Sequence, residues 1–302
     1  MSRVVVALGG NALLQRDERP GAQVQYHHVE AAAAPLAAIA ARHALIVTHG
    51  NGPQVGLLAL ESAADPDLEA PYPFDTLGAE TQGMIGYWLA QALRNATGGA
   101  EVVALVTQTV VDPTDPAFTH PTKFVGRPYD EAEAHALAAA RGWVVRPDGA
   151  RWRRVVASPE PLEVVEVAVL ERLVGLGVVP VCAGGGGVPV VREGGRLRGV
   201  EAVIDKDLAS ALVARALRAD LLVMATDVAH VELGFGTPEA RPLERVTPGE
   251  LAGMTFAPGS MGPKVEAARR FVAATGGRAA IGALGALAGL VAGGAGTQVV
   301  PD

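Results

Sequence analysis

Residues 4–13 are Val-Val-Val-Ala-Leu-Gly-Gly-Asn-Ala-Leu, a run of five apolar residues that leads into two glycines. A continuous apolar run of this length predicts a strand buried on both faces, which is typical of a parallel sheet. Comparable runs at 45–47, 102–106, 178–182 and 221–225 alternate with alanine-rich segments of helical length, such as 23–42 and 54–63. This order predicts an α/β fold, a three-layer αβα sandwich around a mostly parallel sheet.

Four of the predicted strands run directly into polar or glycine-rich turns. These turns contain Gly9-Gly10-Asn11, Gly50-Asn51-Gly52, Gly184–Gly187 and Thr226-Asp227. Ligands of an open parallel sheet bind beyond the carboxyl ends of its strands, so we expect the turns to meet at one edge. Glycines there let backbone N–H groups approach an anion such as an oligophosphate. Each turn alone is also compatible with a tight turn of no further function, and none has the dinucleotide-binding or P-loop pattern.

The composition argues against several kinds of partner. The 302 residues carry a net charge of −7, which disfavours nucleic acid and anionic membranes. Cys182 is the only cysteine; it fits a reducing cytoplasm, and we expect it to be buried on a strand. We expect no export signal and no spanning helix, because the most hydrophobic tract, 279–291, contains three glycines and predicts a strand, a turn and a short helix.

The segment at about 112–159 departs from the alternating pattern. It has six prolines, an Arg/Trp-rich stretch at 151–154 and one amphipathic helix predicted over Glu131–Arg141. We interpret it as a small protruding lid subdomain inserted into a single domain of residues 1–302.

Lysine is rare in this chain, and every copy lies in a motif rich in Gly, Pro or Asp. Against 22 arginines there are only Lys123, Lys206 and Lys264. Lysine is a compact point charge suited to one oxygen of a phosphate, whereas the guanidinium group of arginine is a broad planar fork. We therefore interpret the three lysines as candidates for chemistry on a phosphate; chance survival is the alternative.

The predicted helix 264–274 places one of these lysines in an unusual position. Pro263 is typical of a helix start, so Lys264 falls in the first turn, where the helix dipole disfavours a cation. A bound polyphosphate would reverse that penalty.

The other two lysines allow a simpler interpretation as well. Lys206 opens a predicted helix at 208–217, where Asp207 would hold lysines by charge-assisted hydrogen bonds and Asp205 would cap the helix. Lys206 could instead form only an ion pair at that cap. Lys123 could swing from the lid onto the edge of the sheet or be a solvated loop cation.

Two other catalytic classes find no support in the sequence. The seven histidines have no H-E-x-x-H spacing and there is no Cys/His cluster, so we predict no metal caged by the protein. His49 is interpreted as a hydrogen-bonding orienter. Ser158 and Ser260 lack the G-x-S-x-G setting of a serine hydrolase.

Six motifs occur in order over nearly the whole chain: VALGGNAL at 6–13, THGNGPQVG at 48–56, TQGMIGY at 81–87, PTK at 121–123, GVEAVIDKD at 199–207 and GSMGPK at 259–264. In combination they resemble the carbamate kinases of the amino acid kinase superfamily. The resemblance implies a cytoplasmic homodimer of arginine catabolism that transfers a phosphoryl group reversibly between ATP and carbamate. It also implies that the enzyme makes ATP from ADP and carbamoyl phosphate, with Mg²⁺ carried by the nucleotide.

The resemblance further implies a role for each motif. Lys123, Lys206 and Lys264 would stabilise the transferred phosphoryl group, and Asp207 would organise them. Carbamate and the phosphoryl group would be held by Gly9, Gly10, Asn11, Gly50, Asn51 and Gly52. The nucleotide would contact Gly184, Gly185, Gly186, Thr226, Asp227, Met261 and Lys264. The chain departs from the family pattern at 124–127, where a proline-rich run is usual, and at 282–285.

The chemistry of these residues agrees with phosphoryl transfer. Such transfer needs positioning and charge stabilisation, which lysines and backbone N–H groups supply, and carbamate is already anionic and needs no general base. Mg²⁺ would be held by phosphate oxygens and water. Two alternatives stay open: a kinase of the same superfamily that acts on another small carboxylate or phosphate, and a non-catalytic nucleotide-binding protein.

We expect the helix around residues 76–89 to form the homodimer interface. Its small residues, Gly78, Ala79, Gly83 and Gly86, would permit close approach of two subunits, with Met84, Ile85 and Trp88 as apolar anchors.

Overall fold

The computed structural model describes residues 1–10, 13–14, 18–19, 21–257, 259 and 261–302, so Asn11 and Ser260 lie outside the described residues. Its main sheet contains β1 (Arg3–Leu8), β2 (Ala44–His49), β3 (Val102–Ala104), β9 (Val179–Cys182), β12 (Leu221–Thr226), β15 (Arg245–Val246), β16 (Arg278–Ala283) and β17 (Thr297–Val299). The strand order is β15-β17-β16-β12-β1-β2-β9-β3. Neighbouring strands pair in parallel except β16 and β17, which confirms the predicted mostly parallel sheet.

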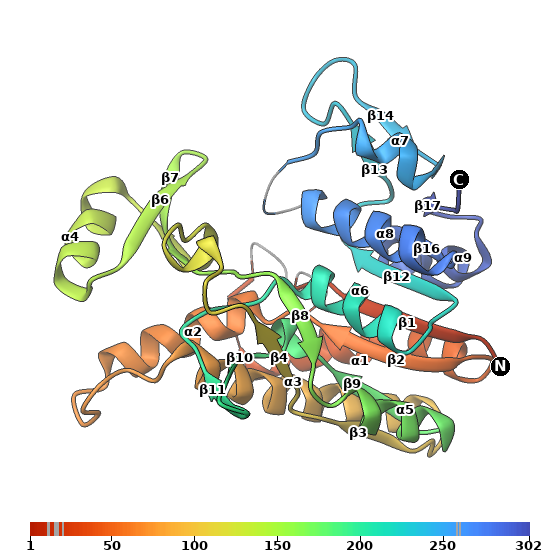
Figure 1. Cartoon of the computed structure of the whole chain (residues 1–302), viewed down its shortest axis with the longest axis horizontal. Coiled ribbons are helices and arrows are strands. Elements are labelled where there is room, and N and C mark those ends of the chain that lie inside the picture. Colours follow the sequence, from red (N-terminus) through yellow and green to blue (C-terminus); the bar gives the residue numbers. More distant parts are fainter. Residues whose placement is uncertain (11–12, 15–17, 20, 258, 260) are drawn as a thin grey trace.

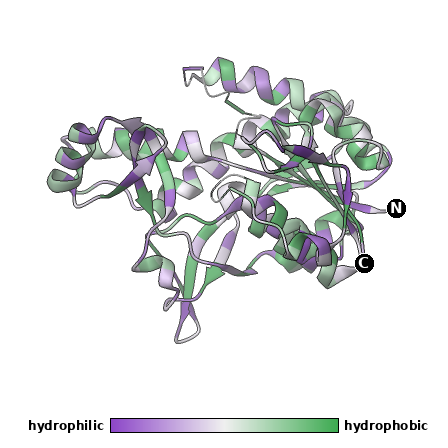
Figure 2. Cartoon of the chain, turned by 90° about the horizontal axis from the view of Figure 1, so that it is seen from above, coloured by the Kyte–Doolittle hydropathy of each residue, from purple (hydrophilic) through white to green (hydrophobic). Residues whose placement is uncertain are grey.

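Helices cover both faces of this sheet (Figure 1). Successive residues of β1 point to opposite faces, so Val5 and Ala7 join one core cluster and Val4, Val6 and Leu8 join the other. The second cluster is closed by α1 (Ala22–Ala40), α3 (Phe74–Ala96) and α9 (Leu287–Ala292). The first is closed by α5 (Val167–Gly175), α6 (Lys206–Ala216), α7 (Pro248–Ala252) and α8 (Met261–Thr275). This arrangement confirms the predicted three layers, and the helices in Figure 2 carry both hydrophobic and hydrophilic residues, as covering helices should.

A second, four-stranded sheet flanks the main one and was not predicted. It has the order β11-β10-β4-β8 and contains β4 (Gln108–Val111), β8 (Pro161–Val164), β10 (Val188–Glu193) and β11 (Arg196–Gly199). A separate short hairpin is formed by β13 (Val231–Leu233) and β14 (Arg241–Leu243). The chain leaves the four-stranded sheet after β4 and returns to it at β8.

Between these two strands the chain forms a small body that projects from the rest of the molecule (Figure 1). It contains η2 (Pro116–Phe118), β5 (Lys123–Tyr129), α4 (Glu131–Arg141), β6 (Val144–Asp148) and β7 (Arg151–Val156). The three strands form an antiparallel sheet in the order β5-β7-β6. We call residues 112–160 the protruding segment; its action as a lid remains a prediction. Helix α4 has the predicted bounds because Asp130 caps its first turn and Gly142 ends it in the left-handed conformation.

Two helices begin earlier than predicted. Helix α8 begins at Met261 rather than at Lys264, which puts Pro263 at its third residue. Proline is tolerated there because the first four N–H groups of a helix have no partner within the helix. Helix α6 begins at Lys206 rather than at Leu208, because the Asp205 carboxylate accepts hydrogen bonds from the N–H groups of Asp207 and Leu208.

Part of the predicted dimer surface on α3 is wrong. Ile85 is fully buried in the subunit's own core, and a Cβ on Gly86 would lie 2.8 Å from the Cβ of Ala104 on β3. These two residues therefore pack inward. Gly78 is buried as well, whereas Gly83 is exposed, and Ala79, Met84 and Trp88 are half-buried. Within the described part of the chain, no helix is both long enough and apolar enough to cross a membrane.

Candidate active site

The predicted turns lie along one edge of the main sheet. Strands β12, β1, β2 and β9 are consecutive neighbours in the sheet and run parallel, so their carboxyl ends share this edge, as predicted. The N–H group of Gly9 donates to the carbonyl of Ala225 at 3.0 Å, and that of Gly50 donates to the carbonyl of Leu8 at 3.0 Å. Backbone hydrogen bonds thus tie the turns after β12, β1 and β2 to one another.

The close approach of two turns requires glycine at position 50. A Cβ on Gly50 would lie 3.0 Å from the backbone nitrogen of Gly10 and 3.3 Å from Cδ of Lys206. A side chain there would push both the first turn and the lysine out of place. The glycine therefore lets the turns after β1 and β2 contact the start of α6.

The turn after β9 requires glycines for a different reason, because its backbone packs against side chains of the β2 turn. Gly185 has a φ of +63°, and a Cβ on it would overlap the side-chain amide of Asn51, whose Nδ2 donates to Oγ1 of Thr81 at 2.8 Å. Gly184 packs in the same way against the ring of His49. Gly184–Gly186 therefore lie beside the β2 turn, three strands from the Thr226 end of β12, and their contact with a nucleotide remains a prediction.

Two of the three lysines share one buried carboxylate. Lys206 Nζ lies 2.6 Å from Oδ1 of Asp207, and Lys264 Nζ lies 3.1 Å from Oδ2 of the same residue. Lys206 and Asp207 are the first two residues of α6, and Lys264 belongs to the first turn of α8. Two neighbouring helices thus bring residues 57 positions apart onto one carboxylate.

The electrostatics of this group follow from its burial. Burial alone would raise the pKa of Asp207, but Lys206 and Lys264 lower it to about 2. Burial lowers the pKa of Lys206 below its ordinary value, and the attraction of Asp207 opposes that shift. The carboxylate therefore stays ionised at neutral pH and fixes two ammonium groups at the ends of two helices.

The third lysine reaches the same place from the protruding segment. Lys123, the first residue of β5, places Nζ 2.6 Å from Oδ2 of Asp205. The other oxygen of Asp205 accepts the N–H group of Asp207 at 2.9 Å. From the sequence, Asp205 was expected only to cap the helix, so this ion pair was missed. The alternation Asp-Lys-Asp at 205–207 was a signal for it, because it offers a second carboxylate next to the first.

The cluster of three lysines and two aspartates is suited to an anion. Three ammonium groups face two carboxylates, so the cluster has one net positive charge. The first turns of α6 and α8, whose N–H groups favour anions, are part of it. A phosphoryl group that developed negative charge here would be stabilised by fixed charges in a partly desolvated site.

The protruding segment is held against the main body close to Lys123. The Arg154 guanidinium group lies 4.9 Å from the ring centre of Phe74 and 4.7 Å from that of Trp143. A Cβ on Gly56 of α2 (Gly52–Ala64) would lie 2.6 Å from both Cα and N of Gly126 on β5. The contact of Arg154 with Phe74 on α3 and the backbone contact thus hold the segment from which Lys123 extends, whereas the contact with Trp143 lies within the segment.

His49 and Cys182 are buried next to this edge and are not exposed to a ligand. Burial, opposed by a hydrogen bond with the carbonyl of Gly50, lowers the pKa of His49 to about 4, so its ring is neutral at neutral pH. This geometry agrees with an orienting role for the ring. Cys182 is buried on β9, as predicted, and burial raises the pKa of its thiol to about 12.

Three further residues predicted for the nucleotide, Thr226, Asp227 and Met261, lie at the end of β12 and the start of α8. Thr226 ends β12, and its Oγ1 lies 3.1 Å from Oδ1 of Asp227. Met261 begins α8, the helix that also carries Lys264. The described residues contain no group of three or more His, Cys, Asp or Glu side chains that could hold a metal ion. Magnesium carried by the phosphates of the nucleotide remains a prediction.

The comparison with known families identifies the class. Residues 2–282 match the amino acid kinase family, so the chain belongs to that family.

Several relatives of the chain within that family are carbamate kinases. The chain is 53% identical to the carbamate kinase of Rhizobium meliloti (strain 1021) over 293 residues, covering 96% of this chain and 90% of the relative. It is 49% identical to that of Escherichia coli (strain K12) over 299 residues, with 99% of each chain covered. Carbamate kinase from Giardia lamblia bound to AMP-PNP superimposes with a TM-score of 0.91 at 42% identity, covering 100% of this chain and 99% of that one.

Proposed function

We propose that the cluster of Lys123, Lys206 and Lys264 transfers a phosphoryl group between ATP and carbamate. The observation that carries the proposal is the convergence of these lysines on Asp205 and Asp207, directly beside the glycine turns after β1 and β2. Full-length identity of about one half to enzymes named carbamate kinase supports the same reaction.

The transfer requires no proton movement. In the direction of ATP formation, an oxygen of the ADP β-phosphate attacks the phosphorus of carbamoyl phosphate, and the bond from phosphorus to the carbamate oxygen breaks. Carbamate leaves as an anion, so no general acid is needed. Lys206 and Lys264 would contact the oxygens of the phosphoryl group in flight, and Asp207 would hold both lysines in place.

Carbamate would bind at the glycine turns, and the nucleotide would bind at the end of β12. Gly10 and Gly52 would present N–H groups to carbamate, and Gly9 and Gly50, whose N–H groups donate to backbone carbonyls, would hold these turns together. Thr226, Asp227 and Met261 would lie along the nucleotide. Mg²⁺ bound to the nucleotide would neutralise part of its phosphate charge. We expect this enzyme in the cytoplasm, where ATP and ADP are available.

A coupled assay tests the reaction directly. ATP formation from ADP and carbamoyl phosphate is followed with hexokinase and glucose-6-phosphate dehydrogenase, with acetyl phosphate as the matched competing donor. We expect turnover with carbamoyl phosphate to exceed that with acetyl phosphate by at least tenfold. Equal rates would favour a kinase for another small carboxylate, and no ATP formation with nucleotide binding intact would favour a non-catalytic nucleotide-binding protein.

We also propose that two copies of the chain pair through the exposed side of α3. Gly83 is exposed, a Cβ added to it would meet nothing within 4 Å, and Tyr87, one turn further, is 57% exposed. Gly83→Arg should therefore split the dimer, whereas Gly175→Ala on α5 should not. Light scattering at micromolar concentration measures both, and a monomeric parent protein or a dimeric Gly83→Arg would contradict the proposal.

A further inference from the structure

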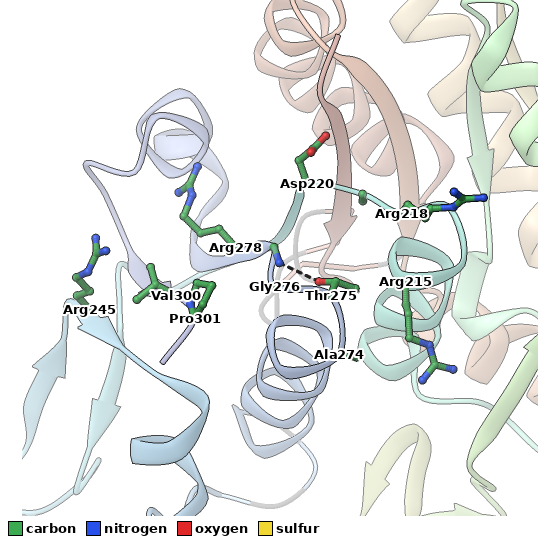
Figure 3. A pocket seen from close by; sticks show the side chains of 12 residues that line it. Arg215, Arg218, Asp220, Arg245, Ala274, Thr275, Gly276, Arg278, Val300 and Pro301 are labelled. Atoms are coloured by element: carbon green, nitrogen blue, oxygen red, sulfur yellow. Dashed lines mark hydrogen bonds between the residues drawn. The ribbon is translucent and has the colours of Figure 1, made fainter.

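An open cavity of about 780 Å³ lies at the edge of the main sheet opposite the lysine cluster. Arg245 and Arg278 lie on one side of it and Arg215 and Arg218 on the other, with Thr275 and Gly276 between them (Figure 3). Among the described residues, one acidic side chain lines it, that of Asp220, whose carboxylate accepts the backbone N–H group of Arg3 at 2.7 Å. This is a concentration of positive charge in a chain whose net charge is −7.

Three of these arginines have no ion pair that would account for them. In the part of the chain that the structure describes, no carboxylate lies within 4.0 Å of the guanidinium groups of Arg215, Arg218 or Arg245, and all three residues are exposed. Other exposed arginines of the chain do find carboxylates, for example Arg192 with Glu163 at 2.6 Å and Arg198 with Glu193 at 2.6 Å. The cavity therefore holds charge that the described residues do not neutralise.

The helix dipole explains only part of this arrangement. Arg215 lies in the last turn of α6, where a cation is favoured. Arg245 and Arg278 come from strands, where that argument does not apply. Arg278 donates to the carbonyl groups of Leu290 and Val291. Burial lowers the pKa of Arg278, and repulsion from Arg245 lowers it further. An anion between these guanidinium groups would relieve that repulsion.

We propose that this cavity binds an oligophosphate anion at a site separate from the lysine cluster. A monovalent ligand would leave most of the arginine charge unbalanced, whereas two or more linked phosphates offer several oxygen pairs to planar guanidinium forks. The volume lies in the range of small-molecule sites. Arg215 and Arg218 would rotate their exposed side chains inward, and they break no ion pair with a described residue in doing so.

The location gives this site a physical connection to the lysine cluster. Helices α6 and α8 pack side by side; their first turns carry Lys206 and Lys264, and their last residues lie at the cavity. At 1.5 Å per residue these helices are roughly 16 and 22 Å long, so the two sites lie at opposite ends of the same rigid elements. An anion that bridged their ends would restrain the relative position of the two lysines.

Pyrophosphate is a direct probe of the cavity, and calorimetric titration measures its binding. The titrations use a Lys206→Ala/Lys264→Ala background, because the lysine cluster is itself an anion site and would mask the signal. In this background we expect one molecule of pyrophosphate per chain to bind. Sulfate should bind at least tenfold more weakly, because it has a single anionic group. Absence of pyrophosphate binding in this background would overturn the proposal.

A pair of charge-matched double variants locates the binding. Arg218→Asn with Arg245→Gln removes two charges from the cavity; asparagine suits position 218 because Arg218 has a φ of +49°. Arg94→Gln with Arg196→Gln removes two exposed charges elsewhere. We expect the cavity pair to weaken pyrophosphate binding at least tenfold and the control pair to change it less than twofold. Equal affinities in both would refute the assignment.

A single variant checks that weaker binding of pyrophosphate is not caused by misfolding. Arg215→Gln changes an exposed residue in the last turn of α6 and should weaken pyrophosphate binding three- to tenfold, while the thermal midpoint stays that of the background. Unchanged binding in Arg215→Gln together with unchanged binding in the cavity pair would exclude the site. Because the lysine cluster is disabled throughout, neither result depends on whether the chain phosphorylates carbamate.

Discussion

The lysine cluster has a core half and a half supplied by the protruding segment, and the two are held in different ways. Lys206 and Lys264 lie in the first turns of helices that are packed on the main sheet, and they share Asp207, whose side chain is only 5% exposed. Lys123 comes from β5 and pairs with Asp205, and its side chain is 31% exposed. The core half is fixed by folding itself, whereas the position of Lys123 depends on how the protruding segment docks.

Removing a lysine from the core half should have the largest effect. Lys264→Ala and Lys206→Ala should each lower kcat by roughly 10²–10³, about 3–4 kcal/mol of transition-state stabilisation. Steady-state kinetics measures the loss. Lys264→Arg should not restore activity, because a guanidinium fork cannot replace a compact ammonium group on one carboxylate oxygen. A Lys264→Arg enzyme within a few-fold of the parent rate would show that position 264 does not require a compact ammonium group.

His49, which is buried next to the core half, should make the protein sensitive to acid in a specific pH window. The pKa of His49 is about 4 in the folded chain and about 6.5 when unfolded, so the unfolded state binds more protons between these values. The free energy of unfolding should therefore fall by roughly 3 kcal/mol as the pH drops from 6.5 to 4. Below pH 4, the contribution of His49 to the free energy of unfolding should not fall further. Below that pH, protonation of Asp207 should take over as the destabilising step, because its pKa is lowered to about 2.

Urea titrations across this range test the assignment. His49→Gln should be less stable at neutral pH, yet it should lose most of the slope between pH 6.5 and 4. If the slope stays the same in His49→Gln, a group other than the His49 ring causes the loss of stability between pH 6.5 and 4.

Lys123 should matter for the reacting complex more than for nucleotide binding. Lys123→Ala should lower kcat roughly 10- to 100-fold and leave the affinity for ADP within about threefold, since the residues expected to contact the nucleotide belong to the core. Calorimetry of ADP binding beside steady-state turnover separates the two effects. A loss of ADP affinity that accounts for the whole defect would place Lys123 outside the catalytic set.

Docking of the protruding segment can be disturbed without changing any charge. Gly56→Ala places a methyl group against the backbone of Gly126, so the segment must shift, and we expect a decrease in kcat of about tenfold, near 1.4 kcal/mol. Gly175→Ala on α5 is the matched control, because its Cβ contacts nothing within 4 Å. Equal activity in both variants would show that the backbone contact does not set the position of Lys123.

The sequence was informative where local patterns decide the structure. The apolar runs located the strands, and the rule that parallel strands share a carboxyl edge brought the turns of Gly9, Gly50 and Gly184 together. The bounds of α4 followed from Asp130 and Gly142. Each of these features depends on residues near one another in the chain.

Features that depend on distant residues were harder to predict. The four-stranded sheet pairs β4 with β8 and β10, and nothing in those short strands indicates their partners. Ile85 and Gly86 face inward because β3 lies against α3, so an amphipathic pattern alone could not exclude them from a dimer surface. The pair between Lys123 and Asp205 joins positions 82 apart and required the folded protruding segment.

The single thiol of the chain has a practical consequence for measuring how the protruding segment docks. Cys182 is buried on β9 with a pKa of about 12, and only the thiolate reacts with maleimides, so the native protein should resist labelling at neutral pH. A cysteine introduced at Val144, which is 46% exposed on β6 of the protruding segment, would then be the one reactive position. An environment-sensitive fluorophore placed there would report docking of that segment in real time, on an otherwise native background and without first removing a cysteine.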